Sequence, residues 1–121
     1  MNDCIFCRII AGEAPATILY ADEQVTAFYD IHPITPVHIL VVPNRHIESV
    51  NEVEEKDTGW LGHLIVVAKQ LAITSGLERR GYRLVINTGP EAGQSVFHLH
   101  LHLIGGRRMP FRFDIEGDDE R

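Results

Sequence analysis

The strictest alternation of hydrophobic and polar residues in the chain runs through SVFHLHLHLIGG, which spans residues 95–106. Histidines occupy every second position there, at His98, His100 and His102. Because successive side chains of a β-strand point to opposite faces, the pattern predicts a strand over residues 96–104. The three imidazoles would share one face, about 7 Å apart. The other face would carry apolar side chains: Phe97, Leu99, Leu101 and Leu103.

The same kind of pattern predicts four further strands. Two runs rich in β-branched and aromatic residues flank the turn Ala-Asp-Glu-Gln, so a hairpin is expected over residues 16–30. A strand is expected over residues 37–43, after the proline-containing connection HPITP and ended by Pro43. Another is expected over residues 82–88, joined to the histidine strand by the loop GPEAGQS.

Two helices complete the predicted elements. A short one is expected over residues 2–12, with Asn2 or Asp3 as its N-cap and Gly12 at its end. A long one is expected over residues 58–76, where apolar residues recur at helical spacing: Leu61, Leu64, Ile65, Ala68, Leu71 and Ala72. Short connections between the strands favour an α+β fold with a mainly antiparallel five-stranded sheet, one short helix and one long helix.

Composition limits the classes of protein and partner. The 121 residues suit a single domain, expected over residues 1–110 and followed by an acidic, flexible tail over residues 111–121. No apolar run approaches the ~20 residues that span a bilayer, so no membrane partner and a cytoplasmic location are expected. The net charge of −6 argues against nucleic acid as a partner. The arginine pairs at residues 79–80 and 107–108 are too short for a basic stripe, although a small anionic ligand is compatible with local donors.

Three aligned imidazoles fit two kinds of chemistry. His98 and His102 would lie about 13 Å apart along a strand, so the three cannot share one zinc ion, but two of them with a remote histidine could. That alternative is a metal-dependent hydrolase or hydratase. In the other interpretation a neutral imidazole attacks phosphorus while a neighbouring histidine donates to phosphate oxygens. The preceding loop, with Gly93, Gln94 and Ser95, would then hold the phosphate through backbone N–H groups and a hydroxyl.

Two separated segments carry a family resemblance. DIHPITPVHILVVPNRH and NTGPEAGQSVFHLHLHLIGGR resemble the histidine triad superfamily, and the final GGR resembles its nucleoside-phosphoramidase branch. The resemblance implies a homodimeric hydrolase that cleaves the α-phosphate P–N or P–O bond of purine nucleoside phosphoramidates or related nucleotides. It would act through a nucleotidyl-histidine intermediate and release AMP. The alternatives are a dinucleoside polyphosphate hydrolase and a nucleotide-binding regulatory module with little turnover.

The resemblance also implies a role for each matching residue. His100 would be the nucleophile, oriented by the carbonyl of His98, while His102 and Ser95 donate to the phosphate or leaving group and His38 supports them. Asp30 would accept from the ribose hydroxyls. The phosphate-side contacts would come from Asn87, Gly93 and Gln94. The apolar slot for the purine would consist of Ile5, Phe6, Ile9, Phe28, Ile31 and Leu40.

The resemblance also implies a metal site beside these residues. Some bacterial members of the superfamily carry a Cys-x-x-Cys that binds zinc together with two histidines, and the matching residues here are Cys4, Cys7, His46 and His98. Cysteines at positions i and i+3 share a helix face, and a Cys₂His₂ set is typical of structural zinc. His32 and His63 match no such role and are expected at the surface.

Overall fold

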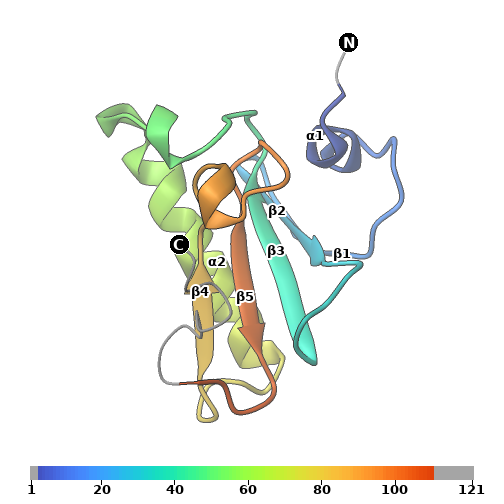
Figure 1. The fold of residues 1–121 in the computed structure, drawn as a ribbon. Helices are drawn as coiled ribbons and strands as arrows, with labels where there is room; N and C mark the ends of the chain where they lie inside the picture. The colour runs from blue at the N-terminus through green and yellow to red at the C-terminus, as the bar shows by residue number, and fades with distance from the viewer. Residues whose placement is uncertain (1–2, 111–121) are drawn as a thin grey trace.

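A single five-stranded sheet organises residues 3–110, the part of the chain that this computed structural model describes. Neighbouring strands are antiparallel and follow the order β1-β2-β3-β5-β4 (Figure 1). The strands are β1 (Ile18–Ala21), β2 (Val25–Tyr29), β3 (Val37–Pro43), β4 (Tyr82–Val85) and β5 (Leu101–Gly105). The helices are α1 (Ile5–Ile10) and α2 (Thr58–Thr74), with 3₁₀ turns at Val50–Glu52, Glu55–Asp57 and Pro90–Ala92. The predicted fold class is therefore confirmed. The predicted tail, residues 111–121, lies outside the described residues.

The central strand β3 is apolar on both faces because each face packs against a different layer. Ile39 and Val41 belong to the main core between the sheet and α2, which buries Leu64 and Val67. Leu40 and Val42 point to the opposite face and form a smaller cluster with Phe6 of α1 and Phe28 of β2. The sheet thus has α2 on one face and α1 on the other, and the second face is the one on which His102 lies, since His102 pairs with Leu40.

The predicted histidine strand is wrong in its first half. β5 begins at Leu101, so His98 and His100 precede the strand. The reason is a change of partner: β3 pairs with β5 only as far as Val41, and upstream the backbone N–H of Leu99 donates to the carbonyl of Ile47 instead (2.8 Å). Phe97 is consequently 46% exposed and does not share the buried face of Leu99, Leu101 and Leu103.

Both helices differ from prediction in detail. The N-cap of α1 is Cys4, whose Sγ accepts from the backbone N–H of Cys7. Gly12 follows the helix with φ +78°, as its predicted terminating role requires. In α2, Ile65 was expected on the buried face but is 51% exposed, and Val67 is buried instead. No helix in residues 3–110 has both the length and the apolar character needed to cross a membrane.

Candidate active site and metal cluster

A cavity of about 400 Å³ lies beneath α1, on the sheet face that bears His102. We call it the α1 pocket. Phe28 and Leu40 are cross-strand partners on β2 and β3, so their side chains form its floor together, and α1 adds Phe6. All six residues of the predicted apolar slot line it, as do Asp30, Ser95, His100 and His102. The lining also includes residues without a predicted role: Pro15, Ala16, Tyr29, His32 and Val96.

His100 has a defined tautomer. Its Nδ1 lies 2.7 Å from the carbonyl oxygen of His98, an acceptor, so Nδ1 carries the proton. Nε2 therefore keeps a lone pair. The side chain is 6% exposed, and the edge of the Phe6 ring packs against the imidazole with centroids 5.0 Å apart. The result is a fixed, neutral imidazole at the wall of the α1 pocket.

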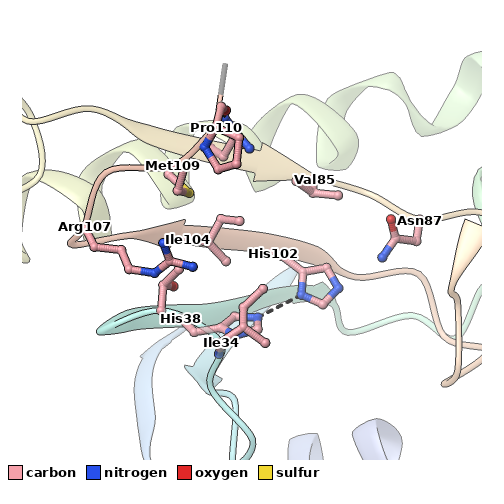
Figure 2. A pocket seen from close by; sticks show the side chains of 11 residues that line it. Ile34, His38, Val85, Asn87, His102, Ile104, Arg107, Met109 and Pro110 are labelled. Carbon is pink, nitrogen blue, oxygen red and sulfur yellow. Dashed lines mark hydrogen bonds between the residues drawn. The ribbon is translucent and has the colours of Figure 1, made fainter. Parts of the chain in front are cut away.

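A chain of hydrogen bonds also fixes the tautomers of His38 and His102. The backbone N–H of Ile34 donates to His38 Nδ1 (3.1 Å), so the proton of the neutral ring is on Nε2. That Nε2–H faces His102 Nδ1 at 3.0 Å, drawn as the dashed line in Figure 2, and Asp30 Oδ2 at 3.3 Å. His102 Nδ1 is thus an acceptor, and its Nε2–H is left as a donor.

These hydrogen bonds also argue against a metal ion among Asp30, His38 and His102. Their ligand atoms lie within 4.8 Å of one another, close enough for one ion. However, His38 Nδ1 accepts a backbone N–H and Nε2 bears the remaining proton, so neutral His38 offers no lone pair to the group. The metal-hydrolase alternative therefore loses Asp30, His38 and His102 as a metal site.

Burial keeps these imidazoles neutral. It lowers the pKa of His38, although the carboxylate of Asp30 acts in the opposite direction. Burial, together with the neighbouring His100 and His38, lowers the pKa of His102 to about 4. At pH 7 both rings are therefore uncharged, in agreement with the tautomers that the hydrogen bonds require.

The loop before the histidines is held by Gln94. Its Oε1 accepts from the backbone N–H of Gly89 (2.8 Å), and its Nε2 donates to the carbonyls of Glu48 (2.7 Å) and Val96 (3.1 Å). Because these bonds occupy the side-chain amide, any contact of Gln94 with a ligand has to come from its backbone. Gly93 has φ +88°, a left-handed conformation that favours glycine. Asn87, expected on the phosphate side, lines a second cavity on the other side of His102.

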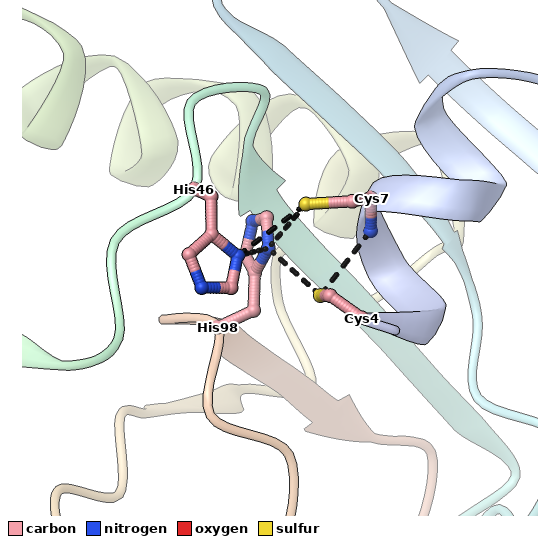
Figure 3. A group of neighbouring side chains, drawn as sticks. All are labelled: Cys4, Cys7, His46 and His98. Carbon is pink, nitrogen blue, oxygen red and sulfur yellow. Dashed lines mark hydrogen bonds between the residues drawn. The ribbon is translucent and has the colours of Figure 1, made fainter. Parts of the chain in front are cut away.

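Four side chains from three parts of the chain converge beside the triad (Figure 3). Cys4 Sγ lies 3.3 Å from His98 Nδ1, and Cys7 Sγ lies 3.3 Å from His46 Nδ1 and 3.5 Å from His98 Nδ1. The two histidine Nδ1 atoms are 3.2 Å apart. Ligand atoms around a tetrahedral zinc ion are separated by about 3.3–3.8 Å, so these four atoms have nearly the spacing of a coordination shell.

The hydrogen bonding of His98 fits this use. Its Nε2 lies 2.8 Å from the carbonyl of Pro43 and so carries the proton, which leaves the Nδ1 lone pair directed at the two sulfurs. Metal-ligating histidines usually donate their other ring N–H in this way. Cys4, Cys7, His46 and His98 can therefore hold a metal ion. The two remaining histidines behave differently: His32 is exposed, whereas His63 pairs with Asp22 (2.7 Å).

Comparisons with known proteins point to one family. The family model of the HIT domain matches residues 11–109. An uncharacterized HIT-like protein of Synechococcus elongatus is 49% identical over 108 residues, covering 89% of this chain and 94% of the relative. The structure of a HIT family hydrolase from Clostridium thermocellum superposes with a TM-score of 0.90 at 45% identity, covering 93% of this chain and 97% of that one. A zinc-bound histidine triad family protein from Mycobacterium smegmatis gives a TM-score of 0.78 at 34% identity, covering 93% and 83%.

Proposed function

The chain belongs to the HIT domain family, and from this premise we propose that it is a nucleotide hydrolase that cleaves purine nucleotides at the α-phosphate and releases AMP. One observation carries the proposal: His100, fixed through Nδ1 by the carbonyl of His98, directs an unprotonated Nε2 at the α1 pocket. An imidazole held in this way is a ready nucleophile. The solved relatives described as HIT family hydrolases support the reaction class.

The proposed reaction has two steps. The lone pair of His100 Nε2 attacks the α-phosphorus and forms a P–N bond, while the bond to the leaving group breaks and its electron pair goes to the leaving nitrogen or oxygen. Water then attacks the nucleotidyl-histidine, the P–N bond breaks, and AMP is released. Over both steps one water is consumed: its hydroxyl joins phosphorus, and its other proton ends on the leaving group or in solvent.

The neighbouring groups stabilise charge rather than form bonds. The Nε2–H of His102 donates to the oxygen or nitrogen on which negative charge develops, and Ser95 adds a hydroxyl donor. His38 is a positioning residue, because its Nε2–H holds His102 in the donor tautomer. Gly93 and Asn87 are proposed as phosphate-side contacts, with Gln94 holding their loop.

The α1 pocket would bind the nucleoside. Its walls are apolar side chains that suit a purine, and its lining contains one carboxylate, Asp30. Asp30 already accepts from the backbone N–H of His32 (2.8 Å), but a carboxylate offers about four acceptor sites, so ribose hydroxyls can still donate to it.

AMP release tests this function against the alternatives. Incubation with adenosine 5′-phosphoramidate or with diadenosine polyphosphates should give AMP with repeated turnover. A nucleotide-binding regulatory module would bind AMP in calorimetry without turning over any of these compounds, and that result would contradict the proposal.

Zinc is the metal we propose for Cys4, Cys7, His46 and His98, in a structural role. Two thiolates and two imidazoles suit zinc, and a closed four-ligand set leaves no position for a substrate. The ion would tie α1, which carries Phe6 into the α1 pocket, to the segment that holds His98 and His100. The zinc-bound mycobacterial relative supports the choice of metal.

We also propose that the protein is a homodimer joined through α2 and β4. Ile65, Val66 and Ile73 on α2 are 51%, 47% and 42% exposed, and Leu84 on β4 is 36% exposed. β4 is also a terminal strand of the sheet, whose outer edge has no strand partner within residues 3–110. A symmetric copy could bury both features together.

Light scattering at micromolar concentration should therefore give twice the chain mass of 13.6 kDa. Ile65→Glu should shift the protein toward the monomer because it places a charge in the proposed apolar interface. Ile18→Glu makes the same exchange at a 46% exposed position of β1, at the opposite edge of the sheet from β4, and is the matched control. A wild-type mass of 13.6 kDa would rule out the dimer.

A further inference from the structure

A second cavity, of about 330 Å³, lies over β4 and β5 on the sheet face that bears His102 (Figure 2). We call it the β4 pocket. After β1, the strand order is β2-β3-β5-β4. The α1 pocket lies on the β2–β3 side of this face, and the β4 pocket lies on the β5–β4 side. His102 lines both cavities. A substrate whose α-phosphorus is beside His100 and whose nucleoside fills the α1 pocket would therefore direct its leaving group past His102 into the β4 pocket.

The two cavities differ in charge. The lining of the α1 pocket contains the carboxylate of Asp30 and neither lysine nor arginine. The β4 pocket contains Arg83 and Arg107 and no carboxylate, and an adjoining hollow that shares both arginines adds Arg80 and Arg108. Within residues 3–110 no carboxylate oxygen lies within 4.0 Å of these four guanidinium groups. A chain with a net charge of −6 thus concentrates positive charge on one side of its reactive centre.

Backbone geometry directs these arginines into the cavity. Arg83 is opposite Ile104 across the β4–β5 ladder, and Val85 is opposite His102, so Arg83 shares the face of His102. Arg107 follows Gly106, which turns the chain with φ +99° and has no room for a Cβ, since one would lie 2.9 Å from Cβ of Pro36. Arg83 donates to the carbonyl of Pro110, and Arg107 Nη1 donates to that of Arg108 (3.0 Å). Each guanidinium keeps further N–H groups for a ligand.

We propose that Arg83 and Arg107 form a subsite for an anionic leaving group, so that the preferred substrates are nucleotides whose α-phosphate is bonded to a further phosphate. The inference rests on the proposed function and specifies its substrate class. When the α-phosphorus–oxygen bond breaks, the electron pair stays on the bridging oxygen, and the departing phosphate gains negative charge. Guanidinium groups pair well with phosphate oxygens and stabilise this charge as it develops.

Two adenylyl substrates with different leaving groups test the subsite. In P1,P3-diadenosine triphosphate the leaving group is the anion ADP, whereas in the p-nitroanilide of AMP it is a neutral amine. Arg83→Met and Arg107→Met should each lower the ratio of kcat/KM for the triphosphate to kcat/KM for the anilide at least tenfold. Arg107→Lys should restore most of the ratio because it restores the charge. Arg79→Met, an exposed neighbour that lines neither cavity, should keep it.

The results that would contradict the subsite can be distinguished from those that would contradict the proposed function. If both methionine variants lower the two kcat/KM values equally, the arginines act on the common adenylyl part or on the fold, and the subsite is wrong. Wild-type protein that cleaves the anilide but not the triphosphate would overturn the subsite and leave the proposed function intact. Wild-type protein that cleaves neither compound would overturn the proposed function and the subsite with it.

Discussion

Replacing His100 by alanine is expected to lower kcat at least about 10⁴-fold, because it removes the only group proposed to bond to phosphorus. His100→Gly and His100→Asn should behave in the same way. All three variants should bind AMP within about tenfold of the wild-type affinity, a difference of ~1.4 kcal/mol, since the α1 pocket and Asp30 remain. Steady-state kinetics and calorimetry separate the two effects.

His102→Ala should lower the rate less than His100→Ala does. It removes one donor to the developing charge, which costs ~10²–10³ in rate, and so leaves more activity than His100→Ala. His63→Ala is the matched histidine control, because His63 pairs with Asp22 and lines neither pocket. This variant should leave kcat within about twofold. If His100→Ala retains more than a few per cent of wild-type activity, His100 is not the nucleophile.

Loss of zinc is expected to have the largest effect on stability. The protein purified without chelator should contain about one zinc ion per chain. Cys4→Ala should lower Tm by about 10 °C, the order expected when about 3 kcal/mol of ligand binding is lost in a domain of this size. A chelator should lower the wild-type Tm similarly and should have little further effect on Cys4→Ala.

Loss of zinc should lower turnover less than it lowers stability. The proposed ion lies beside the reaction, so kcat per folded Cys4→Ala molecule should fall by less than about tenfold. KM for the nucleotide should rise, because Cys4 and Cys7 fasten the helix that carries Phe6 into the α1 pocket. Two results would contradict this account: protein without zinc whose two thiols titrate readily, or a chelator that abolishes turnover while Tm is unchanged. The second would restore the metal-hydrolase alternative.

The sheet was predictable because its strands have periodic or fully apolar patterns that local physics explains. The run ILVV at residues 39–42 is apolar throughout because β3 is covered on both faces, by α2 and by α1 with its small cluster. The pattern at residues 96–100 was misleading for a non-local reason: Leu99 bonds to Ile47, a partner that alternation cannot indicate. The expectation that Phe97 lies on the buried face is therefore wrong.

The candidate site was predictable where it followed motifs and not where it depended on tertiary contacts. The residues of the apolar slot meet in one pocket, and the Cys₂His₂ cluster forms, as the resemblance implied. The Ile34–His38–His102 chain involves a backbone N–H, which no motif records. The arginine pairs at residues 79–80 and 107–108 are each too short to indicate a basic surface. The β4–β5 ladder brings residues 80, 83, 107 and 108 together, and this proximity cannot be read from either pair alone.

Trapping the covalent intermediate tests the central claim most directly. Wild-type protein should be mixed with an α-³²P-labelled adenylyl substrate and quenched with base within a single turnover. A phosphoramidate is stable in base and labile in acid, so label should remain on the protein after the base quench and be lost on acidification. His100→Ala should carry none, while His102→Ala should still become labelled. Turnover by the wild type with no labelled protein at any time, or label on His100→Ala equal to that on the wild type, would contradict nucleophilic attack by His100.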